Sequence, residues 1–210
     1  MIAIIDYDAG NVKSVQNAFA KLGREAVITR DPQAILSADH VVLPGVGNFG
    51  DAMNNLRKYG MEDVIREVID RKIPFLGICV GMQALFESSE ESPDVPGLGI
   101  FKGTVKRFSD KPGMKIPQIG WNSIFPMNHG DLFKGIAGGS YVYFVHSYYV
   151  DAENKNCVKA ICEYANIVDA SVQRGKIFAT QFHPEKSGKV GLAILGNFLL
   201  VKSPNDPEDE

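Results

Sequence analysis

Residues 1–86 alternate short apolar segments with amphipathic segments of helical length, and this alternation constrains the fold more than any other feature. Apolar segments of strand length are expected at residues 2–6, 26–28, 40–43 and 72–78. Helices are expected at residues 11–22, 51–56, 61–70 and 80–86, and another begins at Asp31 and Pro32, an N-cap followed by proline. Repeated strand–helix–strand units predict an α/β fold with a mostly parallel central sheet and helices on both faces.

The second half of the chain is β-rich. Strands are expected at residues 100–108, 119–125, 141–145, 158–164, 167–173 and 177–182, and a last helix at 188–201. These strands are expected to extend or flank the same sheet. With 210 residues, of which 45% are hydrophobic, the chain can bury one sizeable core, so we expect one domain over residues 1–203. Residues 204–210 have the composition of an acidic, polar, disordered tail.

Composition limits the classes of function. The net charge is −3 and the basic residues form no cluster, which argues against a nucleic-acid partner. No segment is long and apolar enough to span a membrane, and no basic leader precedes the first strand, so we expect a cytoplasmic location. Cys79, Cys157 and Cys162 lack the paired spacing of zinc ligands. We therefore expect reduced thiols, no metal and no cofactor.

Cys79 stands between Gly77 and Gly81, where a buried strand is expected to meet a helix. Many α/β enzymes hold a nucleophile on such a sharp turn, and flanking glycines remove side chains that would crowd it. Unpaired N–H groups at the start of a helix favour the thiolate over the thiol. We therefore predict an exposed, strained and activated sulfur. The alternative is a buried structural cysteine that merely follows a core strand.

A cysteine nucleophile needs a base, and His183 has an orienting carboxylate close by. The proline that follows it favours extended backbone, in which Glu185 faces the same side and can hydrogen-bond the imidazole. His40 and His129 have no such neighbour, although His183 could also be a structural residue at a strand end. Together with Cys79, the residues His183 and Glu185 predict acyl transfer through a tetrahedral oxyanion and a thioester.

The oxyanion requires backbone N–H donors, and two places in the chain can supply them. Val80 directly follows the nucleophile, and a loop with Val46 and Gly47 follows another expected strand. The loop also matches the glycine spacing of dinucleotide-binding folds. However, it lacks a convincing acidic ribose ligand at the end of the next strand, and the first strand and turn have no such glycines. We therefore favour an oxyanion loop, with a purely structural turn as the alternative.

Several segments resemble the class I, or triad, glutamine amidotransferases. Residues 77–83 (GICVGMQ) and 181–187 (QFHPEKS) resemble the two catalytic signatures of that family. Further segments are similar to the glutaminase subunits of imidazole glycerol phosphate synthases, namely residues 5–15, 44–53, 85–91, 116–122 and 144–149. Together these segments cover nearly the whole chain in order.

The resemblance implies a role for each matching residue. Cys79 would attack the side-chain carboxamide of glutamine, His183 would transfer protons, and Glu185 would fix the imidazole. The oxyanion donors would come from Val46, Gly47 and Val80, and the glutamine pocket from Gln83, Glu91, His146, Ser147 and Tyr148. Glu91 could instead be a surface charge and His146 a core residue. In the family the oxyanion loop is thought to reorient, so activity would stay low until the partner carries its own substrate.

The resemblance also implies a partner, a separate (β/α)₈-barrel synthase subunit that would form a heterodimer with this chain in histidine biosynthesis. Ammonia would pass to the barrel without entering bulk water. Asn11, Trp121 and Lys186 lie in segments that the family presents to the barrel, although Trp121 could be ordinary core. Two other functions remain open: a glutaminase that serves another synthase, and a non-catalytic binding module on the same fold.

Overall fold

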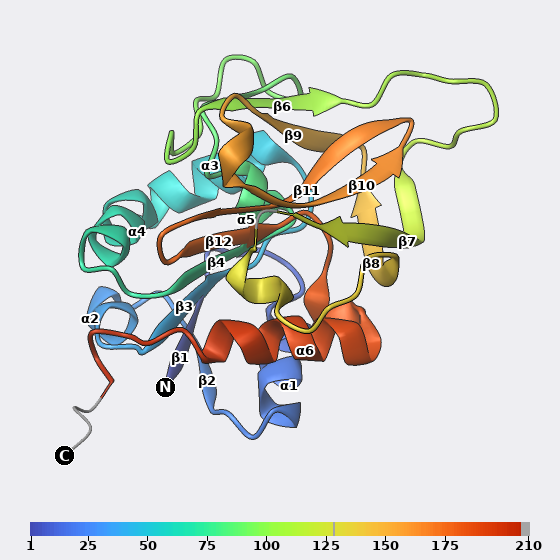
Figure 1. Cartoon of the computed structure of the whole chain (residues 1–210). Helices are drawn as coiled ribbons and strands as arrows, with labels where there is room; N and C mark the ends of the chain where they lie inside the picture. The colour runs from blue at the N-terminus through green and yellow to red at the C-terminus, as the bar shows by residue number, and fades with distance from the viewer. Residues whose placement is uncertain (128, 207–210) are drawn as a thin grey trace.

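A nine-stranded mixed sheet forms the centre of the protein, and a three-stranded sheet lies beside it (Figure 1). The structure is a computed structural model that describes residues 1–127 and 129–206. In spatial order the large sheet consists of β2 (Ala26–Thr29), β1 (Ile2–Ile5), β3 (His40–Leu43), β4 (Phe75–Ile78), β12 (Ile177–Thr180), β11 (Asn166–Arg174), β10 (Val158–Tyr164), β7 (Gln118–Pro126) and β8 (Ser140–His146). The small sheet consists of β5 (Ser88–Ser89), β6 (Gly103–Arg107) and β9 (Tyr148–Ala152).

The parallel part of the large sheet runs from β2 to β12, and the pairs from β12 to β8 are antiparallel. Strands β1, β3, β4 and β12 are buried along their whole length, as expected for parallel strands covered on both faces. The predicted α/β class is confirmed, and the β-rich second half forms the antiparallel part.

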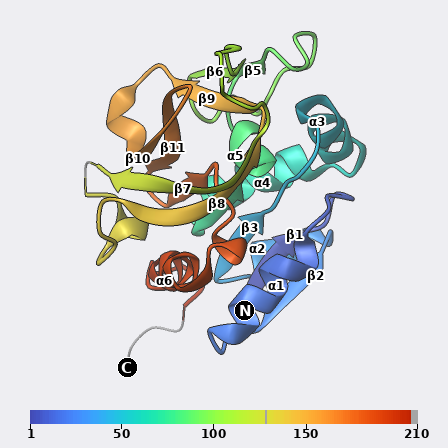
Figure 2. The ribbon, with the colours of Figure 1, turned by 90° about the vertical axis from the view of Figure 1, so that its right-hand side faces the viewer.

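Helices cover both faces of the sheet, with α1 and α6 on one face and α3 and α4 on the other (Figure 2). The helices are α1 (Val12–Lys21), α2 (Pro32–Leu36), α3 (Phe49–Lys58), α4 (Met61–Asp70), α5 (Val80–Gln83) and α6 (Gly188–Leu199). Short 3₁₀ turns are η1 (Asp131–Phe133), η2 (Lys155–Cys157) and η3 (Pro184–Lys186). The predicted start of α2 is confirmed, because the Asp31 carboxylate accepts a hydrogen bond from the Gln33 N–H at 3.0 Å and Pro32 follows it.

Helix α5 is shorter than the helix predicted over residues 80–86. The carbonyl groups that would continue it accept hydrogen bonds from another segment, since the Leu98 N–H donates to Ala84 O and the Phe101 N–H donates to Leu85 O. The chain therefore turns away after Gln83. Strand β9 was not predicted, and it pairs with β6 beyond the end of β8.

The segment after α6 packs against the amino-terminal half of the chain. The Asn205 side-chain amide donates hydrogen bonds to Ala38 O at 2.8 Å and Leu36 O at 3.2 Å. The start of the predicted tail is thus held on the surface, and residues 207–210 lie outside the described residues. Among the residues that are described, no helix has the length and apolar character needed to cross a membrane.

Candidate active site

Cys79 lies on a strained turn between β4 and α5. Its φ of 55° and ψ of −110° fall in a region that non-glycine residues rarely occupy. The Cys79 N–H donates to Thr180 O at 2.7 Å, which fixes the turn against the end of β12. A Cβ on Gly81 would lie 2.1 Å from Leu43 O, so only glycine fits at this position, two residues after Cys79. The strain predicted from the sequence is therefore present.

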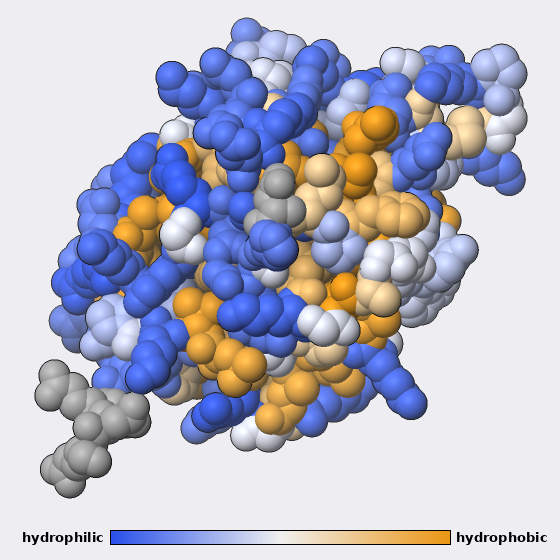
Figure 3. Space-filling model, in the orientation of Figure 1, coloured by the Kyte–Doolittle hydropathy of each residue, from blue (hydrophilic) through white to orange (hydrophobic). Residues whose placement is uncertain are grey.

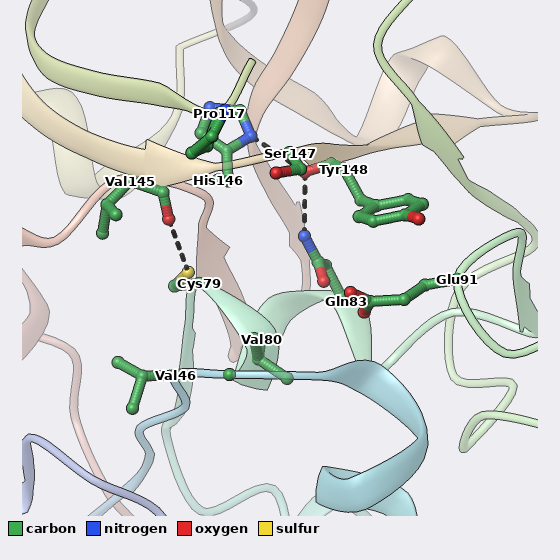
Figure 4. A pocket seen from close by; sticks show the side chains of 11 residues that line it. Val46, Cys79, Val80, Gln83, Glu91, Pro117, Val145, His146, Ser147 and Tyr148 are labelled. Carbon is green, nitrogen blue, oxygen red and sulfur yellow. Dashed lines mark hydrogen bonds between the residues drawn. The ribbon is translucent and has the colours of Figure 1, made fainter.

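The prediction of an exposed sulfur was wrong. Cys79 is 3% exposed, and it lines a pocket of about 260 Å³. Figure 4 shows the sulfur at one side of this pocket, facing the Val145 carbonyl oxygen at 3.9 Å. Any carbonyl compound that reacts with Cys79 must enter this pocket.

His183 and Glu185 form a buried pair beside Cys79. The His183 Nδ1–H donates to Glu185 Oε1 at 2.7 Å, and both side chains are fully buried. Burial alone would lower the pKa of His183, but the Cys79 sulfur and the Glu185 carboxylate outweigh it and raise that pKa to about 10. Nε2 has no partner with full hydrogen-bond geometry among the described residues. The imidazole is thus held in one orientation with one nitrogen available for proton transfer.

The pocket brings together residues from five different segments of the chain (Figure 4). Its lining residues are Val46, Gly47, Cys79, Val80, Gln83, Glu91, Pro117, Val145, His146, Ser147 and Tyr148. All the predicted oxyanion and glutamine-binding residues are in this set. The volume lies just below the roughly 300–1,000 Å³ typical of drug-sized ligands, so a molecule of amino-acid size is a better match than a nucleotide.

Polar side chains in the pocket are held by specific contacts. Gln83 donates through Nε2 to Tyr148 O at 3.0 Å and to Gln181 Oε1 at 3.2 Å. Glu91 accepts a hydrogen bond from the Phe49 N–H at 2.7 Å, at the start of α3. The alternative that Glu91 is a free surface charge is therefore excluded, because its carboxylate is fixed at the pocket wall.

His146 is buried, and burial lowers its pKa to about 4, so the ring is neutral at pH 7. Its Nδ1 lies 2.8 Å from Tyr148 O, and its Nε2 lies 2.9 Å from Gln118 Oε1. Because the carbonyl oxygen can only accept, the proton of the neutral ring is on Nδ1. Nε2 is then an acceptor, which requires the amide orientation that exchanges Gln118 Oε1 for the side-chain nitrogen. The ring thus fixes the backbone of the pocket wall at Tyr148.

The predicted oxyanion loop packs tightly against the turn that carries Cys79. A Cβ on Gly45 would lie 2.5 Å from Gly81 N and 2.8 Å from the Tyr7 hydroxyl oxygen. The Tyr7 hydroxyl donates to Pro44 O at 2.7 Å, and burial raises the pKa of Tyr7, which keeps it protonated. The loop is therefore anchored on both sides, while Gly47 with a φ of 96° keeps the conformational freedom of glycine at the pocket.

The three residues predicted at a partner interface have different surroundings. Trp121 is 56% exposed, which excludes an ordinary core position, and its ring centroid lies 6.1 Å from that of Tyr143. The Lys186 ammonium lies 6.0 Å from the centroid of the same tyrosine ring. Asn11, in contrast, donates from its side-chain amide to Glu185 Oε1 at 2.5 Å.

Sequence reasoning missed several contacts around the sulfur. Gln181 donates from Nε2 to the Cys79 sulfur at 3.7 Å, and Pro117 and Val145 close the pocket. Gln181 was inside a recognised signature, two residues before His183, so its position at the end of the same strand was a usable signal. Pro117 and Val145 lie in the recognised segments 116–122 and 144–149, but nothing in those segments placed them at the pocket, because their approach depends on the antiparallel half of the sheet.

A family model described as glutamine amidotransferase class-I matches residues 3–201. The nucleophile turn, the buried histidine–glutamate pair and the mixed sheet all lie inside this match. The chain belongs to the class I glutamine amidotransferases.

Three relatives that are more than 40% identical are named for one enzyme, imidazole glycerol phosphate synthase. An imidazole glycerol phosphate synthase subunit HisH 1 of Methanococcus maripaludis is 48% identical and covers 95% of this chain and 98% of its own length. A subunit HisH of Moorella thermoacetica is 49% identical, over 94% of this chain and 93% of its own. An Arabidopsis thaliana imidazole glycerol phosphate synthase hisHF is 43% identical over 97% of this chain, but only 35% of its own length is matched. This similarity places the chain among the HisH subunits.

The fold is also similar to that of solved structures. A crystal structure of a glutamine amidotransferase superposes with a TM-score of 0.74, at 20% identity, over 95% of this chain and 97% of its own. The glutaminase domain of Trypanosoma brucei CTPS with bound acivicin gives a TM-score of 0.68 at 17% identity, over 94% of this chain and 93% of its own. At these identities the similarity concerns the fold alone.

Proposed function

We propose that this chain is a glutaminase that hydrolyses glutamine at Cys79 and delivers the ammonia to a (β/α)₈-barrel synthase subunit. The observation that carries the proposal is the strained Cys79 at the pocket, next to the buried His183–Glu185 pair. The barrel would combine the ammonia with a ribulosyl aminoimidazole-carboxamide nucleotide to give imidazole glycerol phosphate and an aminoimidazole carboxamide ribonucleotide. We place this reaction in cytoplasmic histidine biosynthesis, by analogy with the HisH relatives.

In the first step, the Cys79 thiolate attacks the side-chain carbonyl carbon of glutamine, and the carbonyl π electrons move to oxygen. Backbone N–H groups of Val80 and of the loop with Val46 and Gly47 would stabilise this oxyanion. Protonated His183 then gives its Nε2 proton to the amide nitrogen, the C–N bond breaks, and ammonia leaves a thioester. Before the attack, the Cys79 sulfur and the Glu185 carboxylate raise the pKa of His183 to about 10, so the ring begins this step as the imidazolium.

In the second step, neutral His183 removes a proton from a water molecule that attacks the thioester carbon. The resulting tetrahedral intermediate expels the Cys79 thiolate and releases glutamate, while His183 is again protonated. Glu185 holds the imidazole in the required tautomer throughout through the Nδ1–Oε1 hydrogen bond. No metal or organic cofactor is required for this balance of protons and electrons.

Glutamine binding would depend on the polar wall of the same pocket. Gln83 and Glu91 are fixed by hydrogen bonds on the side nearest α3, and the backbone at His146, Ser147 and Tyr148 forms the opposite wall. The Glu91 carboxylate offers a counter-charge to the α-ammonium group of an amino acid, whereas backbone groups suit its amide and carboxylate.

An exposed apolar patch on β7 and β8 supports the proposed partner. The patch consists of Ile119, Trp121, Tyr141 and Tyr143, which lie on one face because Trp121 pairs with Tyr143 and Ile119 pairs with Val145. On the face of the molecule drawn in Figure 3, hydrophobic side chains gather near the centre and hydrophilic side chains cover most of the margin. Val145 also lines the catalytic pocket, so a protein docked on the patch would lie close to the point of ammonia release.

The test is glutamate release by the purified chain, with and without the barrel subunit and its nucleotide. We expect slow turnover alone, strong stimulation by the loaded barrel, and loss of turnover in Cys79→Ser. Cys157→Ser is the matched control, because this half-buried cysteine lies outside the pocket. Turnover without stimulation would indicate a glutaminase of another synthase. Undiminished turnover in Cys79→Ser would refute the catalytic assignment, and no turnover under any condition would favour a binding module.

A further inference from the structure

Glu185 is held by two hydrogen bonds, and only one of them comes from His183. Its Oε1 accepts from His183 Nδ1 at 2.7 Å and from Asn11 Nδ2 at 2.5 Å. Oε2 has no hydrogen-bond partner among residues 1–127 and 129–206. A fully buried carboxylate needs hydrogen-bond donors to satisfy and fix its oxygens, and the Asn11 amide shares this task with His183.

Asn11 is committed to this contact by its place in the fold. It immediately precedes α1 with φ 72° and ψ 2°, a left-handed conformation that asparagine, aspartate and glycine tolerate best. Asparagine in this position commonly caps the helix with its side chain, but Asn11 makes no such cap. Its amide instead reaches a residue 174 positions away, at the place where α1 packs against η3.

We propose that Asn11 is a positioning residue of the active site, the fourth member of a relay with Glu185, His183 and Cys79 in which hydrogen bonds join Asn11, Glu185 and His183. This inference rests on the proposed glutaminase function. Asn11 touches neither substrate nor sulfur. It keeps the Glu185 carboxylate turned toward His183 Nδ1, and this contact holds Nε2 in position for proton transfer with Cys79 and the leaving nitrogen.

The chemistry of two substitutions separates this role from a structural one. Both Asn11→Gly and Asn11→Asp accommodate the left-handed backbone, so neither imposes the strain that alanine would cause. Glycine removes the donor. Aspartate keeps the size of the side chain and places a second carboxylate against Glu185. If Asn11 only shaped the turn, aspartate would be the better replacement; if it donates to Glu185, aspartate would be the worse one.

The experiment compares wild type, both Asn11 variants and Asp8→Asn as the matched control. Asp8 has a φ of 63° in the same turn, but its hydrogen bonds go to Arg30 and Tyr59 rather than to Glu185. The measurements are the rate of alkylation of Cys79 by iodoacetamide, followed by mass spectrometry of its peptide, and kcat and KM for glutamine. Thermal unfolding confirms that each variant is folded.

We expect the alkylation rate and kcat to fall about 10–100-fold in Asn11→Gly and further in Asn11→Asp, with KM changed little and the control close to wild type. Equal alkylation in all four proteins, or an aspartate variant more active than the glycine variant, would overturn the proposal. If aspartate prevents folding, the glycine variant alone decides. If wild type releases no glutamate from glutamine, the proposed function fails, whereas the alkylation rates still test the relay.

Discussion

Lowering the pH from 7.5 to 5 is expected to destabilise the fold through His146. Burial lowers the pKa of this histidine from its usual 6.5 to about 4, so it stays neutral in the folded state while it becomes charged in the unfolded state. The stabilisation is therefore present above pH 6.5 and is lost as the pH falls from 6.5 toward 4. With these two pKa values, proton binding to the unfolded chain at pH 5 removes about 2 kcal/mol of unfolding free energy.

Other histidines do not obscure this effect. Burial also lowers the pKa of His40, so this histidine destabilises the fold on acidification as His146 does. His40 is present in all the proteins compared, and its effect therefore cancels. His183 has a raised pKa, so its contribution is complete below pH 6.5 and changes only at higher pH, toward about 10. The difference between wild type and a His146 variant therefore isolates the single ring.

The assay is urea unfolding at pH 7.5 and pH 5, followed by far-ultraviolet circular dichroism. Wild type should lose about 2 kcal/mol more between the two pH values than His146→Gln, which has no ring to protonate. His129→Gln, at an exposed turn, should lose as much as wild type. Equal losses in wild type and His146→Gln would refute the reasoning. If the variant does not fold, an NMR titration of the wild-type ring that gives a pKa near 6.5 would refute it as well.

Three further outcomes are expected. Gly81→Ala should lower the unfolding free energy by more than about 2 kcal/mol and abolish glutaminase activity, because the new Cβ would lie 2.1 Å from Leu43 O; thermal unfolding measures this loss. Glu91→Gln should raise KM for glutamine about tenfold with a smaller change in kcat, because the proposed counter-charge is removed while an oxygen remains for the Phe49 N–H; initial rates test this split. Trp121→Ala should weaken binding of the barrel subunit at least about tenfold, since an exposed aromatic side chain is removed from the patch; calorimetric titration gives the affinity.

Much of the fold followed from local patterns. Strands β3 and β10 and helix α4 have the predicted bounds, since their hydrophobic periodicity agrees with their burial in the structure. The shortened α5 and the missed β9 have a common cause. Both depend on hydrogen bonds to distant segments, residues 98–101 in one case and β6 in the other, and no local pattern reports such bonds.

In the candidate site, too, contacts between neighbouring residues were predicted, whereas contacts between distant segments were not. The predicted hydrogen bond between His183 and Glu185 is present, but the predicted extended backbone was wrong. Only His183 is extended, and Glu185 reaches the imidazole because Pro184–Lys186 form the 3₁₀ turn η3. The burial of Cys79 could not be predicted, because it depends on Val145 and the antiparallel half of the sheet closing over the turn. The contact from Asn11 to Glu185 was likewise hidden, since it joins the two ends of the chain.

The position of β12 has a consequence for biosynthesis of the protein itself. This strand lies between β4 and β11 in the large sheet, yet it is translated after the other eight strands of that sheet. Until it is inserted, the two parts of the sheet have no shared strand, and the thiol has no imidazole beside it. A nascent chain that lacks β12 and the His183–Glu185 pair therefore has an incomplete site, and chemical competence arrives only after these residues have been translated.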